Sequence, residues 1–166
     1  MKALPKKSDF TLDKTDRRIL EVMQKNGRIS NLELAEEIGL SPTPCARRVK
    51  RLEETGVIEQ HVTRLNQARL GLNITAMISI TMDRHTPARF EIFEKAIDRF
   101  PEIVECSIVT GQAADYLLKA VLRDMTYYEE FLLGRLTRIQ GVIGVHSSFV
   151  LRKVIDRNSL PLDHIP

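Results

Sequence analysis

The residues of this 166-residue chain that are best suited to chemistry form one basic cluster. Four of the five positions from 47 to 51 are basic. An arginine can grip a guanine edge or a phosphate with two parallel hydrogen bonds, and a lysine suits a phosphate as a point charge. Hydroxyl groups just before the cluster can donate to the same phosphates. The candidate DNA-binding residues are Ser41, Thr43, Arg47, Arg48, Lys50 and Arg51.

Two short helices joined by a tight turn are predicted to carry this cluster. Ser30 followed by Glu33 is a capping box for the first of them, and Gly39 ends it, since glycine suits a left-handed helix end. Ser41 then caps a basic helix that runs to residue 55. A compact helical hairpin with a basic second helix can place that helix in the DNA major groove.

A further helix is predicted from Asp13 to about residue 26, with Asp13 as its cap and Asp16 where a carboxylate favours the first turn. At 100° per residue, the basic helix turns Cys45, Val49 and Leu52 inward. The same count turns Thr43, Arg47, Lys50, Arg51 and Glu54 away from the protein, with Arg48 on the flank. A solvated face paired with Glu53 and Glu54 remains the alternative interpretation of this charge.

The second half of the chain alternates strand and helix patterns. Strands are predicted at 74–82, 103–110, 116–122 and 142–154, and helices at 87–99 and 126–138. The order βαββαβ is that of the ferredoxin-like fold, in which two helices cover one face of an antiparallel sheet. The other face of the first strand carries Thr75, Met77, Ser79 and Thr81, which are neither charged nor strongly apolar. A solvent face would hold more charge, so we expect a second subunit to cover it, with an exposed face as the alternative.

Five segments follow from these patterns. They are a flexible N-terminus (1–11), a helix-turn-helix domain (12–60), a linker (61–73), a ferredoxin-like effector-binding and oligomerisation domain (74–156) and a C-terminal tail (157–166). Residues 57–65 alternate enough for a short two-stranded wing or a strand leading out of the first domain.

Charge and composition narrow the class of protein. The net charge is +3, with 12 basic against 10 acidic residues in 1–60 and 13 against 12 in 61–166, so DNA affinity must come from the local cluster. No stretch approaches 18 apolar residues and the N-terminus lacks a signal-peptide core, which predicts a soluble, cytoplasmic, nucleoid-associated protein without a membrane partner. Two distant cysteines and four scattered histidines predict reduced thiols and no metal site. No catalytic constellation stands out, so we expect no enzyme.

Several segments resemble the Lrp/AsnC family, the leucine-responsive or feast/famine regulators. They are LDKTDRRIL (12–20), GRISNLELAEEIGLSPTPCARRVKRLEETGVI (27–58), ECSIVTGQAADYLLKAVLRDM (105–125) and GVIGVHSSFVL (141–151). The resemblance covers residues 12–156. It implies a transcription factor that binds pseudo-palindromic double-stranded DNA as a homodimer, assembles further, commonly to an octamer, and uses no cofactor beyond an amino-acid effector in a cleft between regulatory domains. The recognition helix would be Ser41 to Thr55.

The resemblance also places the effector loop at Gly111 to Asp115. The family commonly has two residues between this glycine and aspartate, whereas this chain has three. Backbone groups at a glycine turn can bind an α-carboxylate, and Asp115 can hold an α-ammonium, with an ordinary turn cap as the alternative. The side chains of Ala113 and Ala114 are small and uncharged, so they leave space for the ligand's side chain and favour Leu, Met or a branched-chain amino acid. The candidate effector residues are Ile108, Thr110, Gly111, Gln112, Ala113, Ala114, Asp115, Tyr116, Met125, Ser147 and Ser148, with Leu118 as a further apolar neighbour.

The sequence therefore predicts an α+β protein, with an N-terminal winged helix-turn-helix domain and a C-terminal ferredoxin-like βαββαβ domain. The predicted function is sequence-specific transcriptional regulation in which an amino acid changes the oligomeric state or the operator affinity. One alternative is a ligand-independent architectural protein that oligomerises and wraps DNA. Another is an enzyme or regulatory subunit with the hairpin as a docking module, against which the missing catalytic residues argue.

Overall fold

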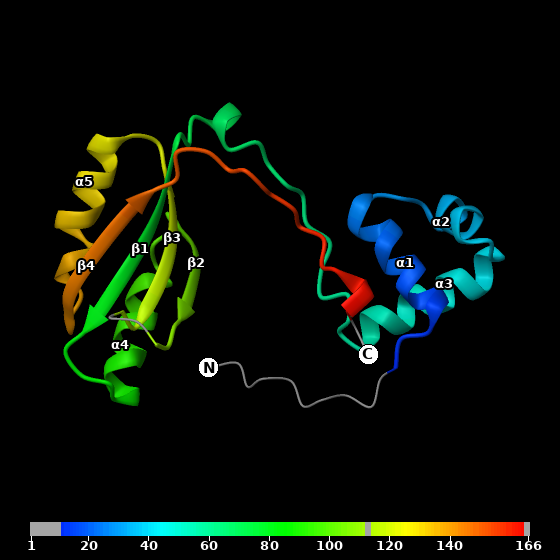
Figure 1. The fold of residues 1–166 in the computed structure, drawn as a ribbon, viewed down its shortest axis with the longest axis horizontal. Helices are drawn as coiled ribbons and strands as arrows, with labels where there is room; N and C mark the ends of the chain where they lie inside the picture. The colour runs from blue at the N-terminus through cyan, green and yellow to red at the C-terminus, as the bar shows by residue number, and fades with distance from the viewer. Residues whose placement is uncertain (1–10, 112–113, 165–166) are drawn as a thin grey trace. The chain divides into compact units, whose positions relative to one another are not determined.

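The computed structural model describes residues 11–111 and 114–164. The chain divides into two compact units, one formed by residues up to 64 together with the chain from 155 onward, and the other by residues 65–154. No helix in the described ranges is both long and apolar enough to cross a bilayer. The first unit holds helices α1 (Lys14–Lys25), α2 (Asn31–Ile38) and α3 (Pro42–Glu54) (Figure 1).

The helix ends of the first unit follow the predicted capping residues. Asp13 and Asp16 form a reciprocal capping box at α1, and Ser30 and Glu33 form the predicted one at α2. Gly39 ends α2 with a φ of 72°, the left-handed region that glycine tolerates. These predictions are confirmed. Ser41 also stands at the cap position of α3, but its side chain makes no capping hydrogen bond.

The C-terminal segment completes the core of the first unit. The backbone N–H of Leu160 donates to Oε1 of Gln24 in α1 at 2.5 Å, and Nε2 of Gln24 donates to the carbonyl of Leu160 at 3.3 Å. Leu162 packs against the core of the helical unit. This core is formed by Ile19, Leu20, Val22, Leu34, Ala35, Cys45 and Leu52. The end of the chain, expected as a separate tail, is therefore part of the helical unit.

Residues 57–65 form no strand, so the predicted strand or two-stranded wing is wrong for this segment of the described chain. The alternating residues Val57, Val62 and Leu65 are exposed by 37%, 68% and 66%. Period-two hydrophobicity marks a strand only when a second strand pairs with it. The described residues provide no such partner here.

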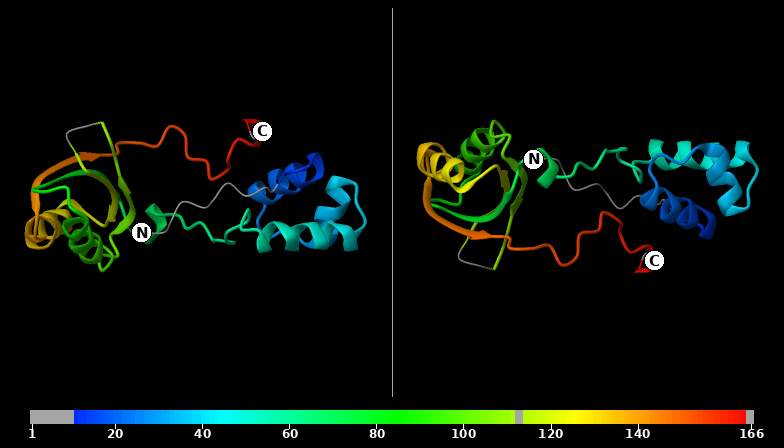
Figure 2. Two further views of the ribbon diagram at one scale, coloured as in Figure 1. Left: turned by 90° about the horizontal axis from the view of Figure 1, so that it is seen from below. Right: turned by 90° about the horizontal axis from the view of Figure 1, so that it is seen from above.

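The second unit is a four-stranded antiparallel sheet covered by two helices. Its elements are β1 (Ile74–Met82), α4 (Pro87–Ile97), β2 (Ile103–Ile108), β3 (Tyr116–Leu122), α5 (Met125–Gly134) and β4 (Val142–Phe149). The strand order is β2-β3-β1-β4, and both helices lie on the same face of the sheet (Figures 1 and 2). The predicted ferredoxin-like arrangement is confirmed.

Three predicted elements extend too far. The helix expected at 126–138 ends at Gly134 and continues as a short 3₁₀ helix (Leu136–Arg138). The strand expected at 142–154 ends at Phe149, because β4 pairs only with β1 and the last backbone bond, from Val150 to Thr75, lies at the start of β1. The strand expected at 103–110 ends at Ile108. Two further 3₁₀ helices, Ala68–Leu70 and Leu162–His164, lie outside the predicted elements.

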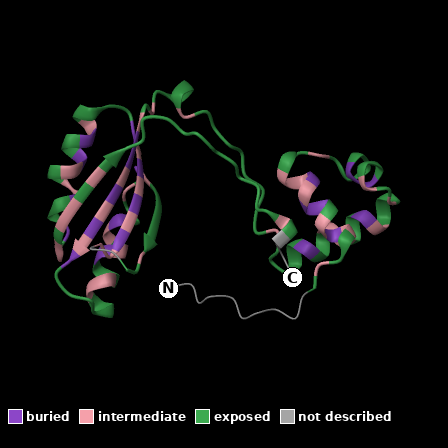
Figure 3. Cartoon of the chain, viewed as in Figure 1, coloured by how far each residue is buried: buried purple, intermediate pink, exposed green. Residues whose placement is uncertain are grey.

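Burial alternates along β1 and β3 as the period-two pattern requires (Figure 3). The helix-covered face holds a closed apolar core built around Ile78, Leu118, Phe93 and Phe131, all no more than 1% exposed. On the other face Thr75 is only 6% exposed, because Nε2 of Gln67 donates to its Oγ1 at 3.0 Å. Residues 77, 79 and 81 on that face are half-buried.

One carboxylate lies buried at the edge of this core. Glu102 is 7% exposed, and its Oε1 accepts hydrogen bonds from the hydroxyl of Tyr127 at 2.5 Å and from Arg135 at 2.6 Å. The guanidinium of Arg135 in turn lies 4.2 Å from the ring centre of Phe100. Burial alone would raise the pKa of Glu102, but the bonds from Tyr127 and Arg135 outweigh it and hold the pKa below its ordinary value.

Replacing this carboxylate should lower the stability of the second unit. We expect Glu102→Gln to reduce the free energy of unfolding by about 1–3 kcal/mol, because it removes charged hydrogen bonds at a buried site. A depressed pKa stabilises the fold above the unfolded-state pKa and loses that stabilisation as the pH falls through the folded-state pKa. In thermal unfolding between pH 7 and pH 3, the melting temperature of Glu102→Gln should therefore fall less steeply with decreasing pH than that of the wild type. Glu129→Gln, at an exposed position of α5, is the control; an equally steep fall in wild type and Glu102→Gln would contradict the assignment.

Candidate DNA interface and effector pocket

Helix α3 presents its basic residues on two different faces. Arg47 and Lys50 share one face with Thr43 and are exposed; the Lys50 side chain is 74% exposed and lies 3.6 Å from Glu54. Arg47 makes no hydrogen bond or ion pair with any described residue. This face is therefore open to a large anionic partner.

Arg48 and Arg51 are directed instead toward α1. Nη1 of Arg48 lies 2.6 Å from Oδ2 of Asp13 and 2.8 Å from Oδ1 of Asp16, and Nη2 of Arg51 lies 2.5 Å from Oδ2 of Asp16. Asp16, expected only as a favourable first-turn residue, is 0% exposed. Arg51 is predicted to point away from the protein, and its side chain is 46% exposed, but its guanidinium bends back to Asp16, because a buried carboxylate requires cationic partners.

The ion pairs also affect the titration of their members. The backbone N–H of Asp16 and the guanidinium of Arg48 hold the pKa of Asp13 below its ordinary value. The same contacts with Asp13 and Asp16 raise the pKa of Arg48. Asp13 stays ionised and Arg48 stays protonated at physiological pH, so their attraction persists.

The N-terminus of α3 offers a second kind of contact. The hydroxyl of Ser41 is not used as a cap, and Thr43 is exposed one turn before Arg47. Nδ2 of Asn31 donates to the carbonyl of Pro42 at 2.9 Å and ties the start of α3 to α2. Backbone N–H groups and hydroxyls at a helix start suit phosphate.

The predicted effector loop joins β2 to β3. Gln112 and Ala113 lie outside the described residues, and Thr110 and Gly111 are exposed. Ala114 and Asp115 are half-buried. Asp115 is therefore the loop residue whose side-chain chemistry can be followed here.

Both carboxylate oxygens of Asp115 have partners in the chain. Oδ2 accepts the backbone N–H of Met82 at 2.7 Å, and Oδ1 lies 2.7 Å from Nε2 of His85. The Asp115 side chain is only 17% exposed. The Asp115 carboxylate is thus bonded to the end of β1 and to the residues that follow it, which is a third arrangement beside the α-ammonium contact and the turn cap. His85 was not singled out in the sequence, since only the fold brings residues 30 positions apart together.

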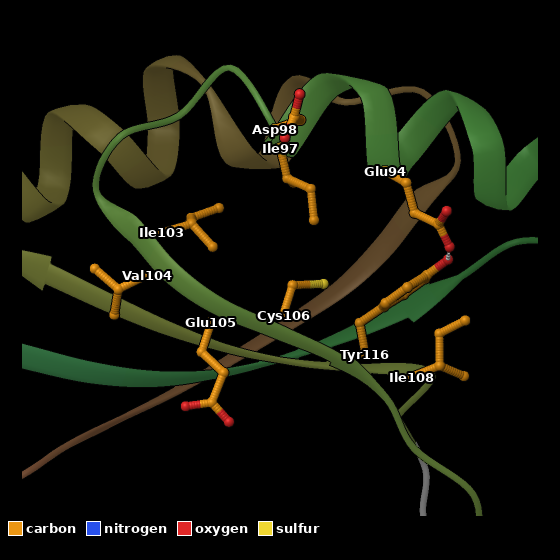
Figure 4. Close-up of a pocket in the computed structure, with 9 residues that line it drawn as sticks. All are labelled: Glu94, Ile97, Asp98, Ile103, Val104, Glu105, Cys106, Ile108 and Tyr116. Carbon is orange, nitrogen blue, oxygen red and sulfur yellow. Dashed lines mark hydrogen bonds between the residues drawn. The ribbon is translucent and has the colours of Figure 1, made fainter. Parts of the chain in front are cut away.

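A pocket of about 430 Å3 opens beside this loop, between α4 and β2 (Figure 4). Two predicted effector residues, Ile108 and Tyr116, line it. They are joined by residues that the sequence analysis did not assign to the effector site: Glu94, Ile97, Asp98, Ile103, Val104, Glu105 and Cys106. The register of β2 against β3, which pairs Ile108 with Tyr116, is the signal that could have found the pocket.

One end of the pocket is polar and the remainder mostly apolar. The hydroxyl of Tyr116 donates to Oε1 of Glu94 at 3.0 Å, and burial together with this bond raises the pKa of Tyr116, so the hydroxyl keeps its proton. Although Cys106 is exposed as a residue, desolvation and the charge of Glu94 raise the pKa of its thiol to about 11. Glu105 points to the opposite side of β2 (Figure 4). The pocket can thus hold a cationic group at Glu94 beside an aliphatic chain.

The remaining predicted effector residues lie elsewhere in the subunit. Met125 is the first residue of α5, which follows the C-terminal end of β3, whereas Asp115 precedes the N-terminal end of that strand. Ser147 and Ser148 occupy opposite faces of β4, which pairs with β1 and not with β3. Within a single subunit the two serines therefore face different sides of the sheet, and their place in a cleft between subunits stays a prediction, with serines merely tolerated in a strand as the alternative. Leu118 is 0% exposed and belongs to the core.

Neither metal chemistry nor a disulfide is indicated in the described ranges. No group of three or more His, Cys, Asp or Glu side chains there could hold a metal ion. Cys45 is buried and Cys106 exposed, and both are free thiols. The pocket and the α3 face are therefore the two candidate sites.

Comparison with known proteins identifies the families of both units. Residues 12–59 match a winged helix-turn-helix DNA-binding model, and residues 75–160 match the Lrp/AsnC ligand binding domain. The leucine-responsive regulatory proteins of Escherichia coli K12 and Klebsiella pneumoniae are each 42% identical over 149 residues, 90% of this chain and 90% of theirs.

Solved structures give the same relationship. A transcriptional regulator of Neisseria meningitidis in complex with L-Met is similar with a TM-score of 0.89 and 41% identity, covering 93% of this chain and 99% of that one. An AsnC family regulator of Agrobacterium tumefaciens has a TM-score of 0.87 and 32% identity, covering 93% and 100%. Two domain models, close relatives over nine-tenths of the chain and the shared fold lead to one conclusion: the chain belongs to the Lrp/AsnC family, whose members are DNA-binding transcriptional regulators and not enzymes.

Proposed function

We propose that this regulator binds an apolar amino acid, Leu, Met or a branched-chain residue, and that binding changes its oligomeric state or its affinity for operator DNA. The observation that carries the proposal is the pocket between α4 and β2, which sets the carboxylate of Glu94 beside an aliphatic wall. The ammonium group of an amino acid fits beside the Glu94 carboxylate, and an unbranched or branched hydrocarbon side chain fits against the aliphatic wall. The L-Met complex of the Neisseria relative and the name of the enterobacterial ones support this class of ligand.

The pocket also suggests why ligand and assembly are coupled. Its nine described lining residues include three acidic side chains and no basic one. An amino acid whose ammonium faces Glu94 therefore directs its carboxylate out of the pocket, toward any subunit that packs there. A ligand that contacts two subunits favours the assembly in which both are present.

A homodimer that assembles further, up to an octamer, is the proposed form of the protein. The sheet face opposite the helices carries Met77, Ser79, Leu117 and Val121, all half-buried within one chain, together with Lys119, whose charge is paired with Glu105 at 4.0 Å. A second subunit covering this face would remove apolar surface from water. Pairing two α3 helices in this way would also set their spacing against two operator half-sites.

For DNA contact, the proposal assigns the primary role to the exposed face of α3. Arg47 reads a base edge or a phosphate, Lys50 binds a phosphate, and Ser41 and Thr43 donate to the backbone near the helix start. Operator preference distinguishes this regulator from the architectural alternative, which would compact any duplex equally and ignore amino acids.

Arg47→Ala tests the DNA face. We expect it to weaken binding to an operator selected from a random duplex library by about 1–3 kcal/mol, as measured by fluorescence anisotropy, because a base or phosphate contact is lost. Lys25→Ala, which removes an exposed positive charge at the end of α1, is the matched control. Wild-type affinity for Arg47→Ala would remove this residue from the interface.

Glu94→Gln tests the pocket. Titration calorimetry and thermal shift with the twenty common amino acids should show binding of an apolar amino acid to the wild type. Removing the charge of Glu94 should weaken that binding by about ten- to a hundredfold, since a charge-assisted hydrogen bond contributes about 1.5–3 kcal/mol. Glu105→Gln is the matched control, because Glu105 lies on the same pocket rim but points to the other side of β2 (Figure 4).

Two outcomes would contradict the proposal. If no amino acid binds or changes the oligomer distribution in sedimentation velocity, the protein does not respond to amino acids. If an apolar amino acid binds and Glu94→Gln leaves its affinity unchanged, the effector lies in another site.

A further inference from the structure

The four basic residues of α3 differ in whether an acidic side chain lies against them. Arg47 and Lys50 lie on the exposed face, where the only ion pair is the 3.6 Å contact of Lys50 with Glu54 among the described residues. Arg48 and Arg51 contact acidic residues of α1 at 2.5 to 2.8 Å. The contrast lies in what faces each side chain, because all four have full positive charge at physiological pH.

The acidic side of these contacts is built into the fold. The Asp16 side chain is 0% exposed, with one oxygen on Arg48 and the other on Arg51, while the Asp13 side chain is half-exposed and also bound to Arg48. Oδ2 of Asp16 additionally accepts the backbone N–H of Asp13 at 3.2 Å. The cluster of Asp13, Asp16, Arg48 and Arg51, called here the α1–α3 clamp, contains two negative and two positive charges.

A buried carboxylate does not exchange its partners readily. Removing Arg48 or Arg51 from Asp16 would leave one oxygen of a buried carboxylate without its cationic partner, which is unfavourable. DNA phosphates therefore compete poorly for these guanidinium groups. Affinity for DNA of any sequence depends on net positive charge, since each neutralised phosphate releases condensed counterions. A neutral cluster contributes little to that release.

We infer that Asp16 is a positioning residue that limits non-specific DNA binding, because it withholds the charge of Arg48 and Arg51 from the phosphate backbone. Two of the four basic residues of α3, Arg47 and Lys50, are then available to any duplex. The inference rests on the proposed DNA face of α3 and assigns a regulatory property to it. Lower affinity for random DNA raises the ratio of specific to non-specific binding.

The dependence of binding on salt measures this charge directly. A mixed-sequence 30-base-pair duplex is titrated with the full-length protein at a series of KCl concentrations, and log K is plotted against log[KCl]. Each phosphate contact contributes about 0.9 to the slope. For each DNA-bound subunit, Arg47→Gln and Lys50→Gln should each lower the slope by about 0.9, and Arg48→Gln and Arg51→Gln should leave it unchanged.

Asp16→Asn provides the converse test and does not leave a buried charge behind. It should increase the slope by about 0.9 per bound subunit, because it releases Arg51 while Asp13 still holds Arg48, and it should tighten binding to the random duplex and reduce the preference for a selected operator. Adding Arg51→Gln to Asp16→Asn should cancel that increase. Glu21→Gln is the matched control, since it removes a carboxylate of α1 that pairs with Arg18 at 3.3 Å and not with α3. A thermal melt by circular dichroism confirms that each variant is folded.

The role of Asp16 and the DNA face of α3 can fail separately in these measurements. A slope unchanged by Asp16→Asn in a folded protein, or lowered by Arg48→Gln as much as by Arg47→Gln, would overturn the role of Asp16 and leave the DNA face intact. A slope unchanged by both Arg47→Gln and Lys50→Gln would instead remove the proposed DNA face. If the Arg48 and Arg51 variants unfold, Asp16→Asn alone decides.

Discussion

The buried carboxylate of Asp16 imposes the strictest constraint on the helical unit. A charge at 0% exposure must be paired, and the fold pairs it with two arginines on α3. Those contacts fix how α3 rotates against α1, and this rotation determines which of its other residues face outward. Arg47 and Lys50 remain on the exposed face, while the guanidinium groups of Arg48 and Arg51 are held against the carboxylates of Asp13 and Asp16.

The second unit uses one buried and one half-buried carboxylate in a similar way. Glu102, at the start of β2, is bound by Tyr127 and Arg135 from the region of α5. Glu94 on α4 accepts the hydroxyl of Tyr116 from β3. In each case a charged acceptor joins a helix to the sheet. Its hydrogen bonds fix the orientation of the helix more closely than apolar contacts can, because hydrogen bonds are directional. Glu94 differs from Glu102 in that a pocket lies beside it, so that its remaining capacity is available to a ligand.

Local patterns predicted the parts of this fold that local physics determines. Buried residues alternate along β3 and from Ala76 onward along β1, and the capping box of Ser30 and Glu33 marks the start of α2. Contacts between distant residues were not predictable in the same way. Arg51 lies near the boundary between two faces of α3, and only the packing of Asp16, 35 positions away, decides its direction. His85 meets Asp115 for the same reason.

The loop between β2 and β3 leads into Asp115, which directly precedes β3. Its carboxylate accepts the backbone N–H of Met82 and lies 2.7 Å from Nε2 of His85. A carboxylate with both oxygens occupied inside the chain contributes little to recognising an ammonium ion, because ligand binding would first have to break those bonds. Glu94 accepts a hydrogen bond from a neutral hydroxyl, that of Tyr116, and lines a pocket that also has apolar walls. Charge, access and shape therefore meet at Glu94, which makes the pocket beside the loop a better candidate than Asp115 for recognising an ammonium group.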